Sequence, residues 1–347
     1  MYRLLRWRMK NLFKSLFFPA PKPQASASGG SGRPKAREEA GAEFYSDFGG
    51  LWIDRRDALA VLDRKAAEDP DVAVLRPQIE QFIRDGYVVL EQAVSHELID
   101  AYTAELQRHI ASGISPLQVS VPVQGPQDKS VVSLADADVK APLSKILDTY
   151  ACMPSALPMV FNEAVHKFLR AVFEEEVLAF QGLHFERGST QAIHQDTAYV
   201  VADRPLEICA SWLALEDIQP GSGELIYYVG SHHALADWKY SGRFKHYNHE
   251  RDPHAEHMGH LNSLVERSEA QGLELAHFLP KKGDVLIWSA DLAHGGSQIL
   301  NPDVTRRSLV THFSPQSATP NYFRYLPKDK QVYRTYQPGC HTATMYY

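Results

Sequence analysis

Three residues with metal-binding side chains occur at a spacing that suggests a shared site. His194 and Asp196 are separated by one residue, and His294 follows 100 residues after His194 (294 − 194). Two imidazoles and one carboxylate, with the other coordination positions left open, are the ligands of a non-haem Fe(II) oxygenase. We therefore predict that His194, Asp196 and His294 bind iron and form the catalytic centre.

The pair Arg306-Arg307 and the adjoining Ser308 follow the second histidine closely. Alternate residues of a strand point to the same face, so Arg306 and Ser308 can act together while Arg307 points away. A guanidinium offers two parallel donors to a carboxylate. A 2-oxo acid that chelates iron through its keto oxygen and C1 carboxylate leaves any second carboxylate in need of such a cation. We predict that Arg306 and Ser308 bind a dicarboxylate co-substrate, with Arg307 as the alternative, and that O2 takes a remaining position on the iron.

The composition is that of an ordinary soluble globular protein. Hydrophobic residues make up 44% and charged residues 22% of the 347-residue chain, which is long enough for one elaborated domain or for two smaller ones. The three cysteines, Cys152, Cys209 and Cys340, are far apart and include no C-x-x-C pair, which argues against a disulfide framework or a zinc ribbon. We expect an intracellular, cytoplasmic protein.

Residues 1–42 differ from the rest of the chain in charge and complexity. Positions 1–37 carry nine basic side chains and no acid, which leaves a formal charge of −15 for the remainder of a chain whose net charge is −6. That negative balance argues against nucleic-acid binding by the folded part. Residues 1–18 have the pattern of a basic amphipathic helix, for which peripheral membrane contact, organelle targeting and a disordered tail are the three alternatives. Residues 19–42 are typical of a disordered linker.

From residue 43 onward the pattern is that of a single domain in three parts, 43–150, 151–315 and 316–347. The first part is mainly helical: Pro77 is expected to start a helix that ends at Asp85-Gly86, residues 87–90 form a strand, and Ser95 caps the next helix. Residues 111–150 show no clear pattern. The second part begins with a helix-like stretch and continues as short β-type runs between turn residues, which predicts a sandwich or jelly roll. The last part is a C-terminal extension. The expected strands of the second part are 177–185, 198–201, 208–215, 225–229, 275–279, 285–288 and 308–313.

Four stretches of the chain resemble the phytanoyl-CoA dioxygenase (PhyH) family of Fe(II)/2-oxoglutarate-dependent oxygenases. They are FIRDGYVVL (82–90), HQD (194–196), PGSGELIYYVGSHH (220–233), and GDVLIWSADLAHG (283–295) continuing to RRSLVTHF (306–313). The resemblance implies a mainly β fold with flanking helices, built around a double-stranded β-helix, which is a jelly-roll or cupin-like core. The family often has Gly-Ser directly after the histidine, whereas this chain has Gly295-Gly296-Ser297.

The resemblance also implies the activity and the cofactors. It names 2-oxoglutarate as the co-substrate, favours Arg306 over Arg307, and places Trp212 beside the co-substrate. The reaction would be hydroxylation of an unactivated C–H bond with release of succinate and CO2. Because a halogenating relative would need the Asp196 carboxylate to be absent, its presence favours hydroxylation.

Two matters stay open at the level of the sequence. The substrate is a small molecule or a lipid-type compound, and the alternative to an enzyme is a non-catalytic β-helix binding or sensing module tethered at a membrane surface. Residues 246–260 contain five histidines between two expected strands. We expect this segment to be a mobile lid over the active site, and a second metal site there is the less favoured interpretation.

Overall fold

Two β-sheets make up the centre of the molecule. The computed structural model describes residues 42–125 and 128–347, so the predicted basic helix and nearly all of the predicted linker lie outside the described residues. The small sheet has three strands, β7 (Leu225–Tyr228), β8 (Leu275–Phe278) and β10 (His294–Gly296). The large sheet of the described chain has ten strands: β1 (Tyr87–Leu90), β2 (Gln118–Gly125), β3 (Asp128–Ser133), β4 (Lys145–Leu147), β5 (Val177–Phe185), β6 (Cys209–Ala214), β9 (Val285–Ser289), β11 (Ser308–Pro315), β12 (Val332–Gln337) and β13 (Cys340–Thr344).

The order of the strands places the later half of the chain at the centre of the large sheet. The main path runs β1-β9-β6-β11-β5-β4-β2-β3, and the order in the small sheet is β10-β7-β8. All pairs are antiparallel except that β13 runs parallel to β5. Apolar side chains from both sheets meet in one buried cluster, which includes Trp212 and Leu286 from the large sheet and Tyr227 from the small sheet. The fold is therefore the mainly β jelly roll expected from the sequence.

The central strands of the large sheet are buried on both faces, which explains their unbroken apolar runs. Successive residues of a strand point to opposite sides. Leu213 of β6 and Ile287 of β9 pack with residues of the helices, whereas their neighbours Trp212 and Leu286 point into the space between the sheets. The inner face of the large sheet thus faces the small sheet, and a site can form where side chains of the two sheets meet.

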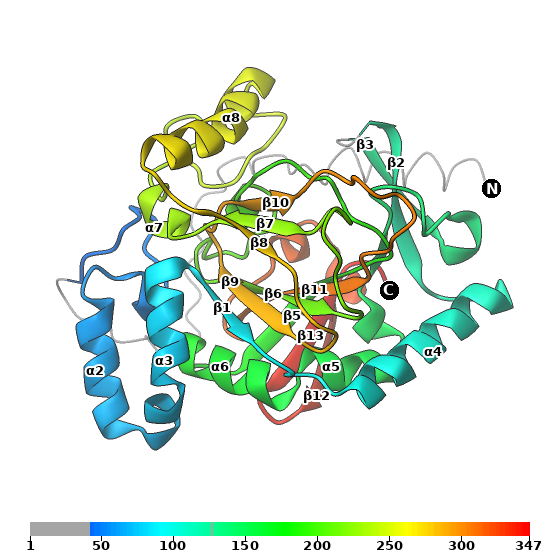
Figure 1. Ribbon diagram of the computed structural model, residues 1–347, viewed down its shortest axis with the longest axis horizontal. Helices are drawn as coiled ribbons and strands as arrows, with labels where there is room; N and C mark the ends of the chain where they lie inside the picture. The colour runs from blue at the N-terminus through cyan, green and yellow to red at the C-terminus, as the bar shows by residue number, and fades with distance from the viewer. Residues whose placement is uncertain (1–41, 126–127) are drawn as a thin grey trace.

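Helices cover the outer face of the large sheet, as Figure 1 shows in its lower half. They are α2 (Ala58–Glu68), α3 (Pro70–Asp85), α4 (His96–Ser112), α5 (Leu157–Val160) and α6 (Glu163–Phe173). The connection from β7 to β8 lies on the side of the small sheet and contains α7 (Ser231–Ala234) and α8 (His254–Ala270). We call residues 235–274, between α7 and β8, the insert.

The structure confirms several predicted boundaries. The strand at 87–90 is β1, and the helix capped by Ser95 is α4, because the Ser95 hydroxyl accepts a hydrogen bond from the amide of Leu98. The predicted strands 177–185, 208–215, 225–229, 275–279, 285–288 and 308–313 correspond to β5, β6, β7, β8, β9 and β11 within one or two residues.

Other predictions about local structure are wrong. Pro77 lies inside α3 instead of starting it, because Asp69 caps the helix and Pro70 occupies its first turn. Residues 198–201 form no strand, since a 3₁₀ turn covers Asp196–Ala198 and the chain then continues irregularly.

The stretch without a clear pattern, 111–150, contributes β2, β3 and β4. The C-terminal extension supplies β12 and β13.

No helix within residues 42–125 or 128–347 is both long enough and apolar enough to cross a bilayer.

Candidate metal centre

Two imidazoles and one carboxylate meet between the two sheets. One oxygen of Asp196, Oδ1, lies 3.8 Å from Nε2 of His194 and 3.7 Å from Nε2 of His294. The three candidate ligand atoms all lie within 4.8 Å of one another, and the residues are 5–7% exposed. In the described chain they are the one group of three or more His, Cys, Asp or Glu side chains close enough to hold a metal ion. The donor set fits the Fe(II) predicted from the sequence.

The backbone around His194 and Asp196 differs from the strand assumed in the prediction. His194 forms an isolated bridge with His294, in which each amide donates to the other residue's carbonyl oxygen at 2.8 and 2.9 Å. Asp196 begins a 3₁₀ turn. Gln195 between them is extended, so the alternation of side chains survives locally although no strand is present. His194 and Asp196 therefore share a side, while the Gln195 amide donates to the carbonyl oxygen of Asp291 at 2.8 Å.

Each candidate histidine ligand is oriented by a backbone carbonyl. Nδ1 of His194 lies 2.8 Å from the carbonyl oxygen of Ala192, and Nδ1 of His294 lies 2.9 Å from that of Leu292. A ring that donates its Nδ1–H to a carbonyl presents the Nε2 lone pair to a metal. Burial, reinforced by the neighbouring His294, lowers the pKa of His194 to about 3, so its ring is neutral at physiological pH and able to bind a cation.

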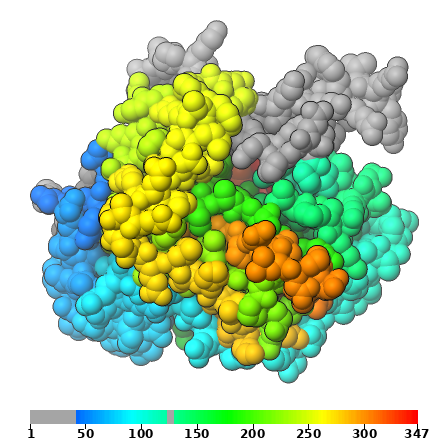
Figure 2. Space-filling view, turned by 45° about the horizontal axis from the view of Figure 1, so that its top comes forward, coloured from blue at the N-terminus to red at the C-terminus, as the bar shows by residue number. Residues whose placement is uncertain are grey.

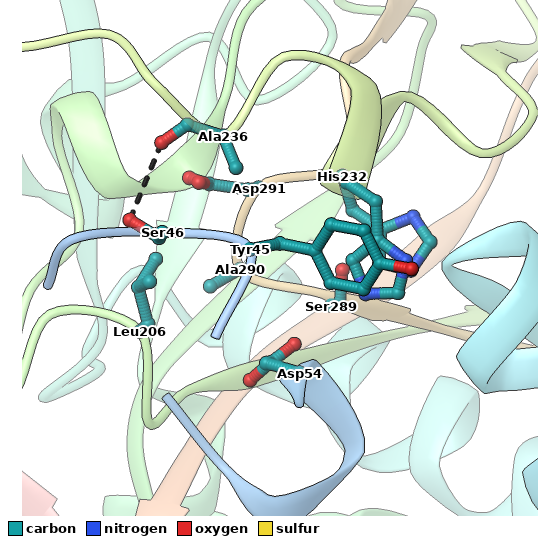
Figure 3. Close-up of a pocket in the computed structure, with 10 residues that line it drawn as sticks. Tyr45, Ser46, Asp54, Leu206, His232, Ala236, Ser289, Ala290 and Asp291 are labelled. Carbon is teal, nitrogen blue, oxygen red and sulfur yellow. Dashed lines mark hydrogen bonds between the residues drawn. The ribbon is translucent and has the colours of Figure 1, made fainter. Parts of the chain in front are cut away.

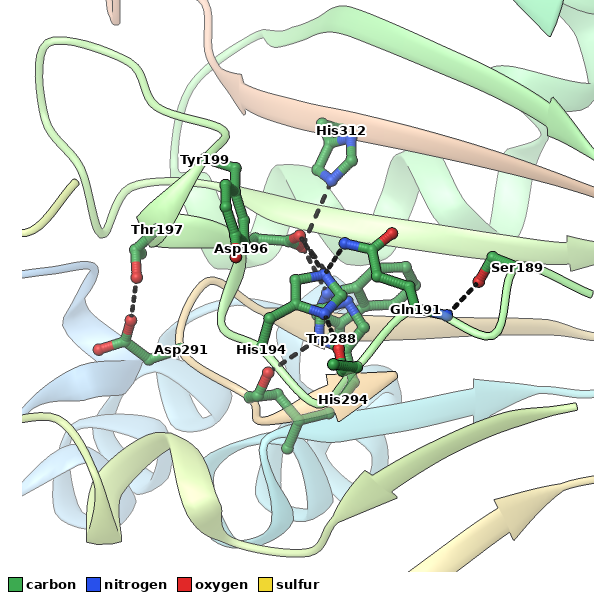
Figure 4. Close-up of polar contacts among 12 residues, drawn as sticks. Ser189, Gln191, His194, Asp196, Thr197, Tyr199, Trp288, Asp291, His294 and His312 are labelled. Carbon is green, nitrogen blue, oxygen red and sulfur yellow. Dashed lines mark hydrogen bonds and ion pairs between the residues drawn. The ribbon is translucent and has the colours of Figure 1, made fainter. Parts of the chain in front are cut away.

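The carboxylate of Asp196 is fixed by two side chains of the large sheet (Figure 4). Its Oδ2 accepts a hydrogen bond from Nε1 of Trp288 at 2.8 Å and lies 3.3 Å from Nε2 of His312. Burial alone would raise the pKa of Asp196, but His294 and His312 outweigh it, and the pKa lies below its ordinary value. Oδ2 is thus taken by these two contacts, and the other carboxylate oxygen, Oδ1, faces the two histidines. Sequence reasoning missed both supporting residues, although they fall inside the stretches GDVLIW and RRSLVTHF.

Arg306, Ser308 and Trp212 lie on the inner face of the large sheet. Arg306 is 2% exposed, and its guanidinium carbon lies 5.2 Å from the ring centre of Phe185 and 5.5 Å from that of Trp212. The side chain of Arg306 has one hydrogen bond in the described chain, a long contact of 3.5 Å from its Nη2 to the carbonyl oxygen of Arg187. Burial lowers the pKa of Arg306 to about 10, which still leaves the group charged at neutral pH. A buried, charged guanidinium with no carboxylate partner among the described residues is suited to an anionic ligand.

Three buried polar atoms in this region lack partners within the described chain: Nε of Arg306, Oγ of Ser308 and Nε1 of Trp212. Buried polar groups are nearly always hydrogen-bonded in folded proteins. The alternative residue, Arg307, is different, because its side chain is paired with Glu216 through contacts of 2.8 and 2.6 Å. The structure thus gives the two arginines different surroundings, as expected, although both lie just before the first residue of β11, Ser308, and not within a strand.

Lys145 and Gln191 are further polar residues near the centre that sequence reasoning missed. The Gln191 amide nitrogen lies 3.1 Å from Nε2 of His194, and its oxygen accepts from Nζ of Lys145 at 3.5 Å. Lys145 is buried and lies 5.2 Å above the Phe185 ring that Arg306 also contacts. Burial, with smaller contributions from Lys129 and Arg306, lowers the pKa of Lys145 to about 7. No sequence signal marks it, because β4 lies in the stretch without a clear pattern.

The glycine pair after His294 is explained by a close approach. A Cβ at Gly295 would lie 2.7 Å from the carbonyl oxygen of Gln191, and one at Gly296 would lie 2.9 Å from the backbone nitrogen of Thr190. The amide of Gly296 donates to the same Gln191 carbonyl oxygen at 2.9 Å. The backbone of β10 therefore packs closely against the loop that carries Gln191, and only glycine permits that contact.

The histidines of 246–260 do not form a second metal site among the described residues. Both ring nitrogens of His257 lie 3.0 Å from tyrosine hydroxyls, those of Tyr199 and Tyr240. The ring of His260 stacks on Trp238. Figure 2 shows the insert, in yellow, covering a large part of one face of the molecule. Its position is compatible with the lid predicted from the sequence, and its mobility stays a prediction.

Solved structures with a similar fold include two non-haem, α-ketoglutarate-dependent enzymes. The epimerase SnoN, solved with Fe3+, α-ketoglutarate and nogalamycin RO, is 17% identical, with a TM-score of 0.52 over 72% of this chain and 86% of the other. The carbocyclase SnoK of nogalamycin biosynthesis is 14% identical, with a TM-score of 0.52 over 73% of this chain and 90% of the other. At such identity the likeness establishes the fold alone. No curated protein sequence shows significant similarity to the chain.

The family model for phytanoyl-CoA dioxygenase (PhyH) matches residues 82–308. That match covers more than half of the chain and includes all three candidate metal ligands. The chain therefore belongs to the phytanoyl-CoA dioxygenase family and is a 2-oxoglutarate-dependent oxygenase, as the resemblance indicated.

Proposed function

We propose that this protein is an Fe(II)- and 2-oxoglutarate-dependent hydroxylase of a small-molecule or lipid-type substrate. In this proposal His194, Asp196 and His294 bind the iron, and Arg306, Ser308 and Trp212 bind 2-oxoglutarate. SnoN is named an epimerase and SnoK a carbocyclase, so the fold hosts more than one outcome. The Asp196 carboxylate favours hydroxylation over halogenation, and a product heavier by one oxygen atom would distinguish hydroxylation from epimerisation or ring closure.

The observation that carries the proposal is the buried guanidinium of Arg306, which faces the space between the sheets and has no described carboxylate within ion-pair distance, Glu224 acting on it only from farther away. Leaving a charge buried without a partner costs several kcal/mol, so a site of this kind is built for a ligand that brings the opposite charge. Ser308 and Trp212 add two unpaired hydrogen-bonding atoms to it. A carboxylate would bind the guanidinium in a bidentate manner and accept from these neighbours.

Bound Fe(II) supplies the redox chemistry, in which O2 and 2-oxoglutarate yield succinate, CO2 and one oxygen atom for the substrate. The protein residues supply position and charge. The carbonyl oxygens of Ala192 and Leu292 hold the two imidazoles with Nε2 toward the metal. Trp288 and His312 occupy one oxygen of Asp196, so the carboxylate binds through the other. A metal ion held by these three side chains would keep its remaining coordination positions for the co-substrate and O2.

Lys145 and Gln191 complete the polar wall beside the centre. Lys145 adds a second buried basic group 5.2 Å from the ring that Arg306 contacts, and its pKa of about 7 leaves it partly protonated at neutral pH. Gln191 connects it to His194 through its amide. We assign these two residues to the binding of anionic groups that approach the centre, because Lys145 has no described carboxylate within ion-pair distance, although Asp196 acts on it from farther away.

The proposal is tested by turnover in the absence of substrate. Iron-loaded full-length protein is expected to form succinate from 2-oxoglutarate slowly without any added substrate, and the His194→Ala variant is expected to form none. Equal succinate formation by both proteins would overturn the proposal. Failure of the wild-type protein both to bind iron and to form succinate would instead favour the non-catalytic binding module.

The substrate is sought by comparing cells that contain the wild-type protein with cells that contain His194→Ala. A hydroxylase is expected to produce a metabolite or lipid heavier by one oxygen atom in the first cells only. If residues 1–18 bind membranes, as the sequence suggests for a lipid-type substrate, deletion of residues 1–40 should abolish binding to anionic vesicles. Equal vesicle binding by the truncated protein would refute that part of the proposal.

A further inference from the structure

A buried carboxylate beside the metal centre has no part in the chemistry described above. Asp291 is 4% exposed and lies between β9 and β10, three residues before His294. Its Oδ1 accepts a hydrogen bond from the Thr197 hydroxyl at 2.6 Å (Figure 4), and its carbonyl oxygen accepts one from the Gln195 amide at 2.8 Å. Gln195 and Thr197 are the two neighbours of Asp196. Asp291 therefore joins the two segments that carry the candidate metal ligands.

Lys245 of the insert provides the opposite charge for Asp291. Its Nζ lies 2.6 Å from Oδ2 of Asp291, and the two side chains are 2% and 6% exposed. The same ammonium group donates to the carbonyl oxygen of Ala236 at 3.0 Å. Because a buried carboxylate is costly without a counter-charge, Lys245 stabilises the ionised form of Asp291 against the burial that raises the pKa of this carboxyl.

The far side of Asp291 is closed by the N-terminal part of the described chain. Asp291 lines a small pocket together with Tyr45 and His232, among other residues (Figure 3). Ser46 donates to the carbonyl oxygen of Ala236 at 3.3 Å, the acceptor that Lys245 also uses. Three distant segments thus converge on one ion pair, which leaves it little freedom to adopt a second arrangement.

We propose that Asp291 and Lys245 are positioning residues for the metal centre: acting through Thr197, their ion pair sets the His194–Asp196 segment against His294. Within the described chain, neither side chain forms a hydrogen bond or an ion pair with His194, Asp196 or His294. This inference rests on the proposed function, because it presumes that the three candidate ligands bind a metal. It also gives the insert a role besides covering the site, since Lys245 belongs to the insert.

The test measures metal binding and stability separately in the full-length protein. Metal is removed with a chelator, Co(II) is titrated by its visible absorption, and unfolding is followed in urea without metal. Thr197→Val, which keeps the shape of the side chain but loses the hydroxyl, should weaken Co(II) binding by about 10-fold or more, the usual effect of losing a group that supports a ligand. Thr197→Ser, which retains the hydroxyl, should bind Co(II) within about 3-fold of the wild type.

A second threonine offers a matched control. The hydroxyl of Thr344 donates to Oδ2 of Asp148 at 2.5 Å, and both residues are 1% exposed, as Thr197 is. Thr344→Val removes the same type of buried hydrogen bond from β13 and is expected to lower the urea midpoint without changing Co(II) affinity. If Thr197→Val and Thr344→Val change Co(II) binding equally little, the positioning role is refuted.

A double variant removes the ion pair without leaving a buried charge unpaired. Lys245→Met with Asp291→Leu replaces the ion pair by apolar side chains, a change that buried ion pairs often tolerate. We expect it to unfold near the wild-type urea concentration but to bind Co(II) more weakly, because Thr197 has lost its acceptor. Wild-type Co(II) affinity in this variant would overturn the inference. If His194→Ala binds Co(II) as tightly as the wild type, the proposed metal centre itself fails, which is a different result.

Discussion

The histidines of the metal centre and those of the insert differ in what their ring nitrogens contact. In the metal centre, Nδ1 of His194 and of His294 is taken by a backbone carbonyl, and both Nε2 atoms face the same carboxylate oxygen. In the insert, both nitrogens of His257 contact tyrosine hydroxyls, and its ring stacks on Tyr247 at 4.1 Å. Convergence of two Nε2 atoms on one carboxylate oxygen, and not the number of histidines, therefore marks a metal site.

The same comparison explains why a region with more histidines is the structural one. Tyr240, Tyr247 and Trp238 surround His257 and His260 with aromatic rings. One buried part of the insert contains the aliphatic side chains of Leu235 and Leu264, and the aromatic rings form another. Histidine serves there as a flat aromatic group with two hydrogen-bonding positions.

The largest difference between the two regions should appear on removal of one histidine from each. His294→Ala removes one of three protein ligands, so iron binding and succinate formation should both fall below detection. His257→Phe keeps an aromatic ring and loses two hydrogen bonds, which should cost about 1–3 kcal/mol of unfolding free energy and leave iron binding intact. Iron titration and urea unfolding of both variants check this. Loss of iron binding in His257→Phe would contradict the comparison.

The two adjacent arginines should differ strongly in their effect on 2-oxoglutarate. Arg306→Met removes the buried cation, and we expect the KM for 2-oxoglutarate to rise roughly 100-fold, because hydrogen bonds to a charged group contribute about 1.5–3 kcal/mol each. Arg307→Met breaks a partly exposed pair with Glu216, so its KM should change by less than about 3-fold. Steady-state succinate assays on both variants provide the test, and similar KM values would remove the assignment of Arg306.

The two tryptophans on the inner wall should affect different ligands. Trp288→Phe takes away the donor to Asp196, so Co(II) affinity should fall about 10-fold while the fold is kept. Trp212→Phe loses the unpaired N–H near Arg306 and should change the KM for 2-oxoglutarate by a smaller factor, with Co(II) affinity unaltered. The reverse pattern would show that the contact between Trp288 and Asp196 does not support the metal.

The smallest expected effect is on the dependence of stability on pH. Burial lowers the pKa of His257 to about 4, and also that of His246, whereas an unfolded histidine titrates near 6.5. Between pH 6.5 and 4 the unfolded chain binds protons that the folded chain does not bind, so the free energy of unfolding decreases as the pH falls. His257→Phe should flatten this decrease in metal-free protein, measured as the urea midpoint from pH 7.5 to 4.5. An unchanged slope would show that His257 is accessible to protons in the folded state.

Much of the fold and the composition of the candidate site could be predicted from the sequence because the central strands have long apolar runs and the ligand types are distinctive. The reasoning behind the site was partly wrong, since His194 and Asp196 lie on a bridge and a 3₁₀ turn and share a side only because Gln195 is extended. Pro77 was misleading because Asp69, eight residues earlier (77 − 69), already caps α3. The roles of the site residues remain predictions until variants are measured.

Other parts of the site could not be predicted because they depend on how distant strands are brought together. Lys145 comes from a three-residue strand with no periodic pattern, and only the register of β4 with β5 places it beside Phe185. Asp291 and Lys245 are 46 residues apart (291 − 245) and give no local signal. Trp288 and His312 could have been found by noting which positions of β9 and β11 alternate inward.

The reciprocal backbone hydrogen bonds between His194 and His294 have a thermodynamic consequence. These two bonds, and the carbonyl contacts of both rings, are made entirely within the protein, so they do not depend on a bound ion. The conformational entropy of bringing the two histidines together is therefore lost during folding and not at the moment of metal capture. Unlike a zinc finger, which folds only around its metal, this chain should fold first. Both amides should exchange slowly with heavy water even in chelated protein.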